Sequence, residues 1–208
     1  MVFLALDSIT NHYDLYVPYD PFSPSELSAM TYHGLLRPQF GPYYVDVTTP
    51  DTPAQRAKAV RLAGERLVDG DWTATMLTAA WIHLGGQAPE MFEASTANYQ
   101  GTRSRSKIIP TAFRNIDYLQ RSDIVDKDLL VIGGTVVTSP ELTVEDLLRG
   151  GRTARHYDCA KELACLLDVS DLQQRFHHKR HFPGMDQAIQ RLDQLVSESN
   201  ALVASPQD

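Results

Sequence analysis

The sequence has few of the residues that an extracellular or membrane protein would need. Its 208 residues include two cysteines, Cys159 and Cys165, and its apolar runs are far shorter than the roughly 20 residues that cross a bilayer. On a helix, the six-residue separation of the two cysteines puts them about 9 Å apart along the axis, too far for a disulfide. MVFLAL at the start has no basic region before Asp7, unlike a signal peptide. These absences predict a cytoplasmic protein with free thiols and no membrane contact.

Positive charge is scarce where a DNA-binding front end would need it. The formal net charge is −7. Residues 1–50 contain one cation, Arg37, against five acids, which are Asp7, Asp14, Asp20, Glu26 and Asp46. Binding to DNA phosphates depends on cations that release counterions. Any contact with nucleic acid must therefore rest on local basic patches.

Recognisable catalytic motifs are also missing. The sequence contains no P-loop, GxGxxG, GxSxG, HExxH or CxxC pattern. The neighbouring acids Glu145 and Asp146 are interpreted as side chains in the first turns of a helix, where the dipole favours negative charge. We therefore expect a binding protein with no enzymatic activity, no cofactor and no metal.

The periodicity of apolar residues predicts an α+β fold. At 43% hydrophobic and 22% charged residues, the composition is typical of a globular protein. SPSEL predicts a helix over 24–36 with Ser23 as N-cap, Pro24 at the first position and Glu26 closing a capping box. RPQFGPYYVDV then predicts a β-hairpin around Gly41. Residues 1–50 are accordingly interpreted as a partial winged-helix front end.

Residues 51–199 are predicted to form a second domain, followed by a frayed tail at 200–208. Two helices are expected first, and the second, DWTATMLTAAWIHLGG, is apolar enough to be a central packing helix. MFEAST, SKIIPTAF and LLVIGGTVVTS then predict a small antiparallel sheet with a hairpin at Gly133–Gly134. A C-terminal helical bundle should follow. Its first helix starts at the Thr138–Pro140 junction and is closed by Gly150–Gly151, and further helices are expected near 156–168, 170–178 and 184–199.

The junction VVTSPELTVEDLL has strong helix-start chemistry, and two assignments are open. In one, Thr138 and Glu141 form a capping box. In the other, Ser139 is the N-cap and Pro140 occupies the first helical position. Either assignment fixes the turn from strand to helix.

Two basic clusters are candidate binding surfaces. Arg103, Arg105 and Lys107 would share one face of a strand, with Arg114 nearby. They could contact phosphate or could protect a sheet edge from aggregation. In RFHHKRHF, the spacing of His177 and His181 is compatible with zinc. A pH-sensitive basic surface for an acidic partner ranks above zinc, and an ordinary solvated surface ranks above both. The candidate set for the partner surface is Arg175, His177, His178, Lys179 and Arg180.

Taken in order, these segments resemble the AbiEi-type antitoxins, especially the actinobacterial ones. The resemblance rests on the Gly41–Val45 hairpin, the helix with Ala79, Ala80, Trp81 and His83, the basic strand, and the VTSPELTVEDL junction. It covers roughly residues 25–192. It implies an antitoxin that counters a nucleotidyltransferase toxin and represses its own operon through a winged helix. The same scaffold also precedes a Vsr-like nuclease domain in other proteins.

The resemblance implies where DNA would bind. The second helix of a helix-turn-helix reader enters the major groove. The DNA-contacting residues would be Ser25, Ser28, Tyr32 and His33 on the helix, Arg37 and Gln39 on the wing, and the basic residues 103–114. The alternatives are an antitoxin that binds protein without DNA and a non-catalytic remnant of the nuclease-fusion proteins. We expect a monomer or a weak dimer.

Overall fold

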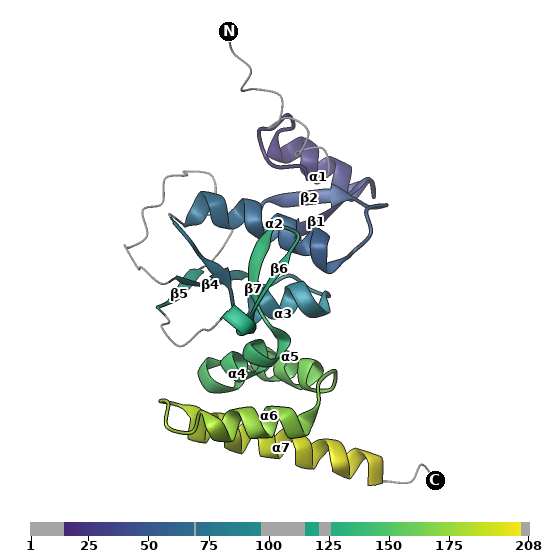
Figure 1. Ribbon diagram of the computed structural model, residues 1–208. Coiled ribbons are helices and arrows are strands. Elements are labelled where there is room, and N and C mark those ends of the chain that lie inside the picture. The colour runs from purple at the N-terminus through teal and green to yellow at the C-terminus, as the bar shows by residue number, and fades with distance from the viewer. Residues whose placement is uncertain (1–14, 69, 97–114, 121–125, 205–208) are drawn as a thin grey trace.

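The computed structural model describes residues 15–68, 70–96, 115–120 and 126–204. It consists of seven α-helices, a two-stranded sheet and a five-stranded sheet within these ranges. Figure 1 shows an elongated molecule with the N-terminal elements at one end and the last two helices at the other. The predicted α+β class is confirmed.

The front end contains a short helix and a hairpin. Helix α1 spans Pro24–Tyr32 and ends earlier than predicted. Its capping box is present: Ser23 Oγ accepts from Glu26 N at 3.3 Å, and Ser23 N donates to Glu26 Oε2 at 2.7 Å. Strands β1 (Leu36–Phe40) and β2 (Tyr43–Asp46) pair antiparallel. Gly41 has φ +55° in the turn, a conformation that glycine adopts at little cost.

The middle of the chain forms the larger sheet and two helices. Helix α2 spans Pro53–Leu67 and α3 spans Met76–Leu84. The strands are β3 (Thr73–Ala74), β4 (Met91–Thr96), β5 (Asn115–Gln120), β6 (Leu129–Ile132) and β7 (Thr135–Thr138), in the order β5-β4-β3-β7-β6. The β4–β5 and β3–β7 pairs are parallel, while the β3–β4 and β6–β7 pairs are antiparallel. The sheet is therefore mixed, where the sequence predicted an antiparallel one.

Two strands differ from the sequence prediction. β3 is two residues long, so it carries no readable alternation, and the sequence placed its residues at the start of a helix. β5 was not predicted, and the whole of the expected strand SKIIPTAF lies outside the described residues. The β6–β7 hairpin is confirmed, with Gly133 and Gly134 at φ +54° and +78°. A side chain on Gly133 would overlap the Ala54 carbonyl at the start of α2, so glycine is required there.

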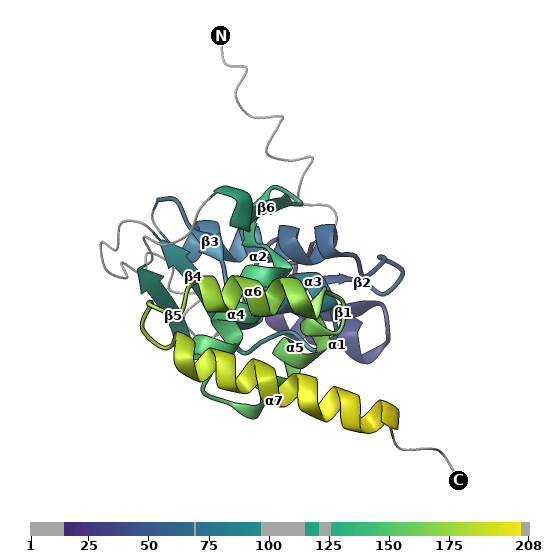
Figure 2. The same ribbon diagram turned by 60° about the horizontal axis from the view of Figure 1, so that its bottom comes forward.

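The C-terminal half is helical. After the 3₁₀ turn Asp126–Asp128 and the hairpin come α4 (Pro140–Gly150), α5 (Ala154–Ala164), α6 (Val169–His178) and α7 (Met185–Ala204). Ser139 is the N-cap of α4, and its Oγ accepts from Leu142 N at 3.3 Å, so the second assignment of the junction holds. Figure 2 shows α6 and α7 side by side. Helix α7 continues to Ala204, into the predicted tail.

Two hydrophobic cores meet at helix α3. Ala79, Trp81 and Ile82 belong to the first core, which lies between the sheet, α2 and the front end. Met76, Leu77 and Ala80 belong to the second, which is formed with α4–α7. The central packing role predicted for this helix is confirmed. Leu15, Val17, Phe40, Tyr43 and Val45 of the front end are part of the first core, so packing continues across the predicted boundary near residue 50.

Candidate interaction surfaces

Helix α1 presents most of its side chains to solvent. Leu27 is its buried residue, whereas Ser25, Ser28, Tyr32 and His33 are exposed. Tyr32 is 88% exposed. The helical residues that the resemblance assigns to DNA therefore lie on an accessible face.

The two wing residues are placed differently from this expectation. The Arg37 guanidinium is engaged within the protein: Nη1 donates to Gln39 Oε1, and Nη2 donates to the Thr49 carbonyl at 3.1 Å. Gln39 is 3% exposed. A side chain buried to this degree does not reach a base edge, so Gln39 is removed from the set of DNA-facing residues. The resemblance placed Gln39 on the wing, whereas in the structure the β1–β2 register shifts between Pro38 and Phe40 and the side chain is buried.

The same end of the molecule exposes apolar side chains. Tyr32 is joined by Leu35, 55% exposed, and Val47, 45% exposed. Val47 N donates to the Leu35 carbonyl at 3.1 Å, which sets these two residues opposite each other at the open end of the hairpin. We call Tyr32, Leu35 and Val47 the front-end apolar patch.

The basic cluster on α6 is divided between the interior and the surface. Arg175 Nε and Lys179 Nζ each lie 2.9 Å from Glu145 Oε2, and Arg175 Nη1 lies 2.7 Å from Asp128 Oδ1. Glu145 is 0% exposed and Asp128 2%. Burial by itself would lower the pKa of Arg175, but hydrogen bonds to Asp128 and Glu145 raise it above its usual value. These two cations therefore stabilise the fold.

The remaining predicted residues of that cluster are exposed. His177, His178 and Arg180 face solvent, and Arg180 Nε lies 3.0 Å from Asp186 Oδ1. The assignment of Arg175 and Lys179 to a partner surface is therefore withdrawn. Glu145 lies in the second turn of α4, as expected from the sequence, but its side chain is fully buried. The basic residues Arg103, Arg105, Lys107 and Arg114 lie outside the described residues.

A pair of buried titratable residues joins strand β4 to the helices. Glu93 Oε2 accepts from Leu77 N at 2.8 Å, at the start of α3. Its Oε1 lies 3.3 Å from His156 Nε2, and His156 Nδ1 lies 2.6 Å from Thr153 Oγ1. Both carboxylate oxygens and both ring nitrogens thus have a partner, which is the arrangement of a structural link. Sequence reasoning missed this link because Glu93 and His156 are 63 residues apart.

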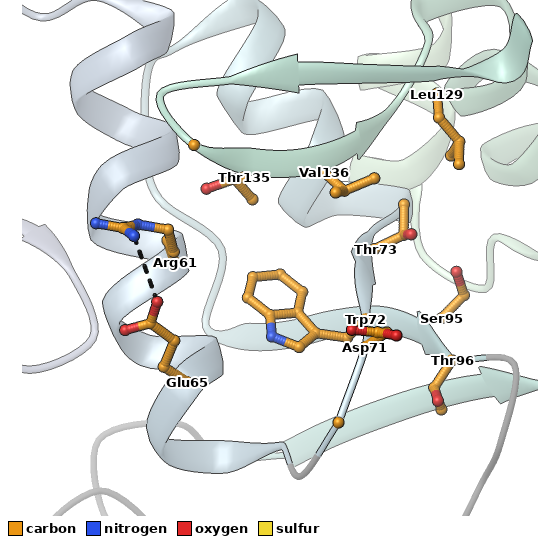
Figure 3. A pocket seen from close by; sticks show the side chains of 12 residues that line it. Arg61, Glu65, Asp71, Trp72, Thr73, Ser95, Thr96, Leu129, Thr135 and Val136 are labelled. Atoms are coloured by element: carbon orange, nitrogen blue, oxygen red, sulfur yellow. Dashed lines mark ion pairs between the residues drawn. The ribbon is translucent and has the colours of Figure 1, made fainter. Parts of the chain in front are cut away.

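A pocket opens between α2 and the sheet (Figure 3). Its volume is about 490 Å³. The lining side chains come from α2, from β3 and the chain before it, and from the ends of β4, β6 and β7; they include Arg61, Glu65, Asp71, Trp72, Thr73, Ser95, Thr96, Leu129, Thr135 and Val136. No sequence pattern pointed to this pocket, because its walls come from segments far apart in the chain.

The described residues also bear on whether the chain has a metal site, a reactive thiol or a membrane-spanning helix. There is no group of three or more His, Cys, Asp and Glu side chains placed to hold a metal ion. Cys159 and Cys165 are free, and burial raises the pKa of the Cys159 thiol, which makes a reactive thiolate less accessible. No helix in this part of the chain is both long and apolar enough to cross a membrane. Neither a protein-family model nor a curated protein sequence matches this chain.

Proposed function

We propose that this chain is an antitoxin that counters a nucleotidyltransferase toxin by binding it as a protein, without reading operator DNA. The toxin-antitoxin assignment rests on the ordered motifs of the sequence. The protein-binding mode rests on one observation, which is the position of Arg37. This cation is the sole basic residue of segment 1–50, and its guanidinium is bonded to Gln39 and Thr49. Little positive charge is left at the front end to meet phosphates.

The chemistry of the front end suits a protein partner. The front-end apolar patch offers surface that water does not solvate well, and such patches mark interaction sites. Asp20, Glu26 and Asp46 belong to the same segment. An apolar centre with acidic neighbours complements a protein surface that has an apolar centre and a basic rim. The proposed partner surface on the toxin is therefore basic.

A growth-rescue experiment tests this proposal. The chain is co-expressed with a neighbouring nucleotidyltransferase, and the Leu35→Ser/Val47→Ser double variant is compared with the natural protein. Both side chains are half-exposed, so the fold should persist while the apolar contact is lost. Leu166→Ser is the matched control, because Leu166 is 72% exposed and lies in the helical half. We expect rescue by the natural chain and the control, and reduced rescue by the double variant.

Two results would contradict the proposal. Equal rescue by the front-end variant and the control would remove the front-end patch from the interface. Failure of the natural chain to rescue growth would remove the antitoxin assignment.

Operator binding is the competing function, and the exposed face of α1 favours it. Its test is a mobility shift with the chain's own upstream DNA at about 50 mM salt, where electrostatic binding is strong. The proposal expects no sequence-specific shift. A salt-dependent shift that weakens when Ser25, Ser28 and Tyr32 are changed to alanine would establish DNA reading by α1.

A further inference from the structure

The pocket of Figure 3 follows from the shortness of strand β3. That strand has two residues, whereas its neighbours β4 and β7 have six and four. Before Thr73 the chain leaves the sheet, so the space between the two neighbours is not filled by a strand. Ser95 and Thr96 line the hollow from β4, and Thr135 and Val136 line it from β7. At about 490 Å³, it falls within the range of small-molecule sites.

Trp72 provides a fixed aromatic wall in this pocket. A side chain on Gly64 would overlap the indole, so the ring packs directly against the backbone of α2. Phe92, fully buried, meets the indole edge-on at 5.4 Å between centroids and 67° between planes. Two contacts thus fix the ring, which still lines the cavity. An aromatic side chain fixed before the ligand arrives is a stacking platform that loses little entropy on binding.

Four hydroxyl side chains are among the lining residues. Thr73, Ser95, Thr96 and Thr135 line the pocket. Thr73 and Ser95 are paired across β3 and β4, so their side chains project from the same face of the sheet. Thr135 Oγ1 donates to the Ala57 carbonyl at 2.7 Å, which holds this hydroxyl in place. Hydroxyls both donate and accept and therefore suit the mixed edge of a nucleobase.

The charges of the lining do not favour phosphate. Arg61 is the cation of the lining, and its Nη1 lies 3.5 Å from Glu65 Oε1. Figure 3 shows this ion pair on α2, at the margin of the pocket. Asp71 is exposed and forms no ion pair within the described ranges. Its carboxylate could accept from a sugar hydroxyl or an exocyclic amine but would repel a phosphate.

We propose that this pocket binds an uncharged nucleoside or its free base. The ring stacks on Trp72, its polar edge bonds to the hydroxyls of β3 and β4, and Asp71 accepts from the sugar or amino group. Binding at this site is independent of the antitoxin function and requires no chemistry from the protein.

Isothermal titration calorimetry of the full chain tests the proposal with adenosine, guanosine, cytidine and uridine, each with its base and 5′-monophosphate. We expect saturable one-site binding of at least one nucleoside and weaker binding of its monophosphate. Trp72→Leu should weaken that binding about 5- to 150-fold, the range that loss of one base–aromatic stack gives. Circular dichroism checks that the variant is folded.

Asp71→Asn is the second variant, because an exposed side chain can be changed without disturbing the core. This variant should bring the affinities for the nucleoside and its monophosphate closer together, because the repulsion between the Asp71 carboxylate and the phosphate is removed. The proposal is overturned if no nucleoside or base binds at millimolar concentration. Tighter binding of the monophosphate, or unchanged binding in a folded Trp72→Leu protein, would overturn it as well. If Trp72→Leu does not fold, the Asp71→Asn variant decides: an unchanged ratio of nucleoside affinity to monophosphate affinity contradicts the proposal.

Discussion

Glu145 is the residue whose replacement tests the structure most directly. Its carboxylate is fully buried and holds Arg175 Nε at 2.9 Å and Lys179 Nζ at 2.9 and 3.0 Å. In Glu145→Gln the side-chain volume is kept and the charge is lost, so two cations with 18% and 19% exposed side chains lose their common partner. Breaking a buried ion pair from one side costs about 3–5 kcal/mol.

The lower end of that range applies here. Arg175 keeps Asp128 Oδ1 at 2.7 Å, and both cations retain some contact with water. We therefore expect a loss of about 3 kcal/mol. For a chain of this size, that loss lowers the melting temperature by about 6–12 °C. Thermal and urea unfolding, followed by circular dichroism, measure it. Glu162→Gln, on the exposed face of α5, is the control and should shift stability by less than about 0.5 kcal/mol.

A double-mutant cycle separates the ion pair from simple packing. Glu145 is the partner of Lys179 in the network, so Lys179→Met added to Glu145→Gln removes a cation that has already lost its carboxylate. The double variant should be more stable than the sum of the two single changes predicts, by about 0.5–3 kcal/mol. The buried network would be refuted if Glu145→Gln were as stable as the control and if the effects of the two single changes on the free energy of unfolding were additive.

Two further changes test other parts of the packing. Gly64→Ala should destabilise the protein by about 1–3 kcal/mol through overpacking, because the new methyl group overlaps Trp72. Gly150→Ala is the control and should be neutral or stabilising, because the nearest atom to its new methyl group is 3.6 Å away. Equal unfolding midpoints for the two variants would contradict the contact between Gly64 and Trp72. Burial lowers the pKa of His83 below its usual 6.5, partly offset by the bond to the Thr138 carbonyl. The unfolded chain therefore binds this proton first as the pH falls, so stability is full above about pH 6.5 and is lost below it. Urea unfolding at pH 7.5 and 5.5 should show that the free energy of unfolding falls more between these two pH values in the natural chain than in His83→Gln. Equal falls in the two proteins would contradict this role of His83.

Local features could be read from the sequence because neighbouring residues determine them. The capping box at Ser23–Glu26, the Gly133–Gly134 hairpin and the start of α4 each depend on a few consecutive side chains. The apolar character of α3 also predicted its central place, since a helix without a polar face must be covered on all sides. Helix boundaries were less reliable, because caps and tertiary contacts compete at helix ends.

The candidate sites depended on contacts between distant segments, which single-sequence periodicity does not encode. Arg175 and Lys179 belong to a visibly basic sequence, but whether they face solvent depends on Glu145, 30 and 34 residues away. Gln39 fits an alternating strand, but the register shift in β1 and the packing of the front end decide its burial.

The sequence by itself therefore determined the α+β class, the turn and cap chemistry, and the shortage of positive charge at the front end. Tertiary structure alone decided that the sheet is mixed, that two cations neutralise a buried carboxylate, and that a pocket opens beside Trp72. The physical reason is range: caps and turns are hydrogen-bonded within a few residues, whereas burial and strand partners are fixed when segments far apart in the chain pack together.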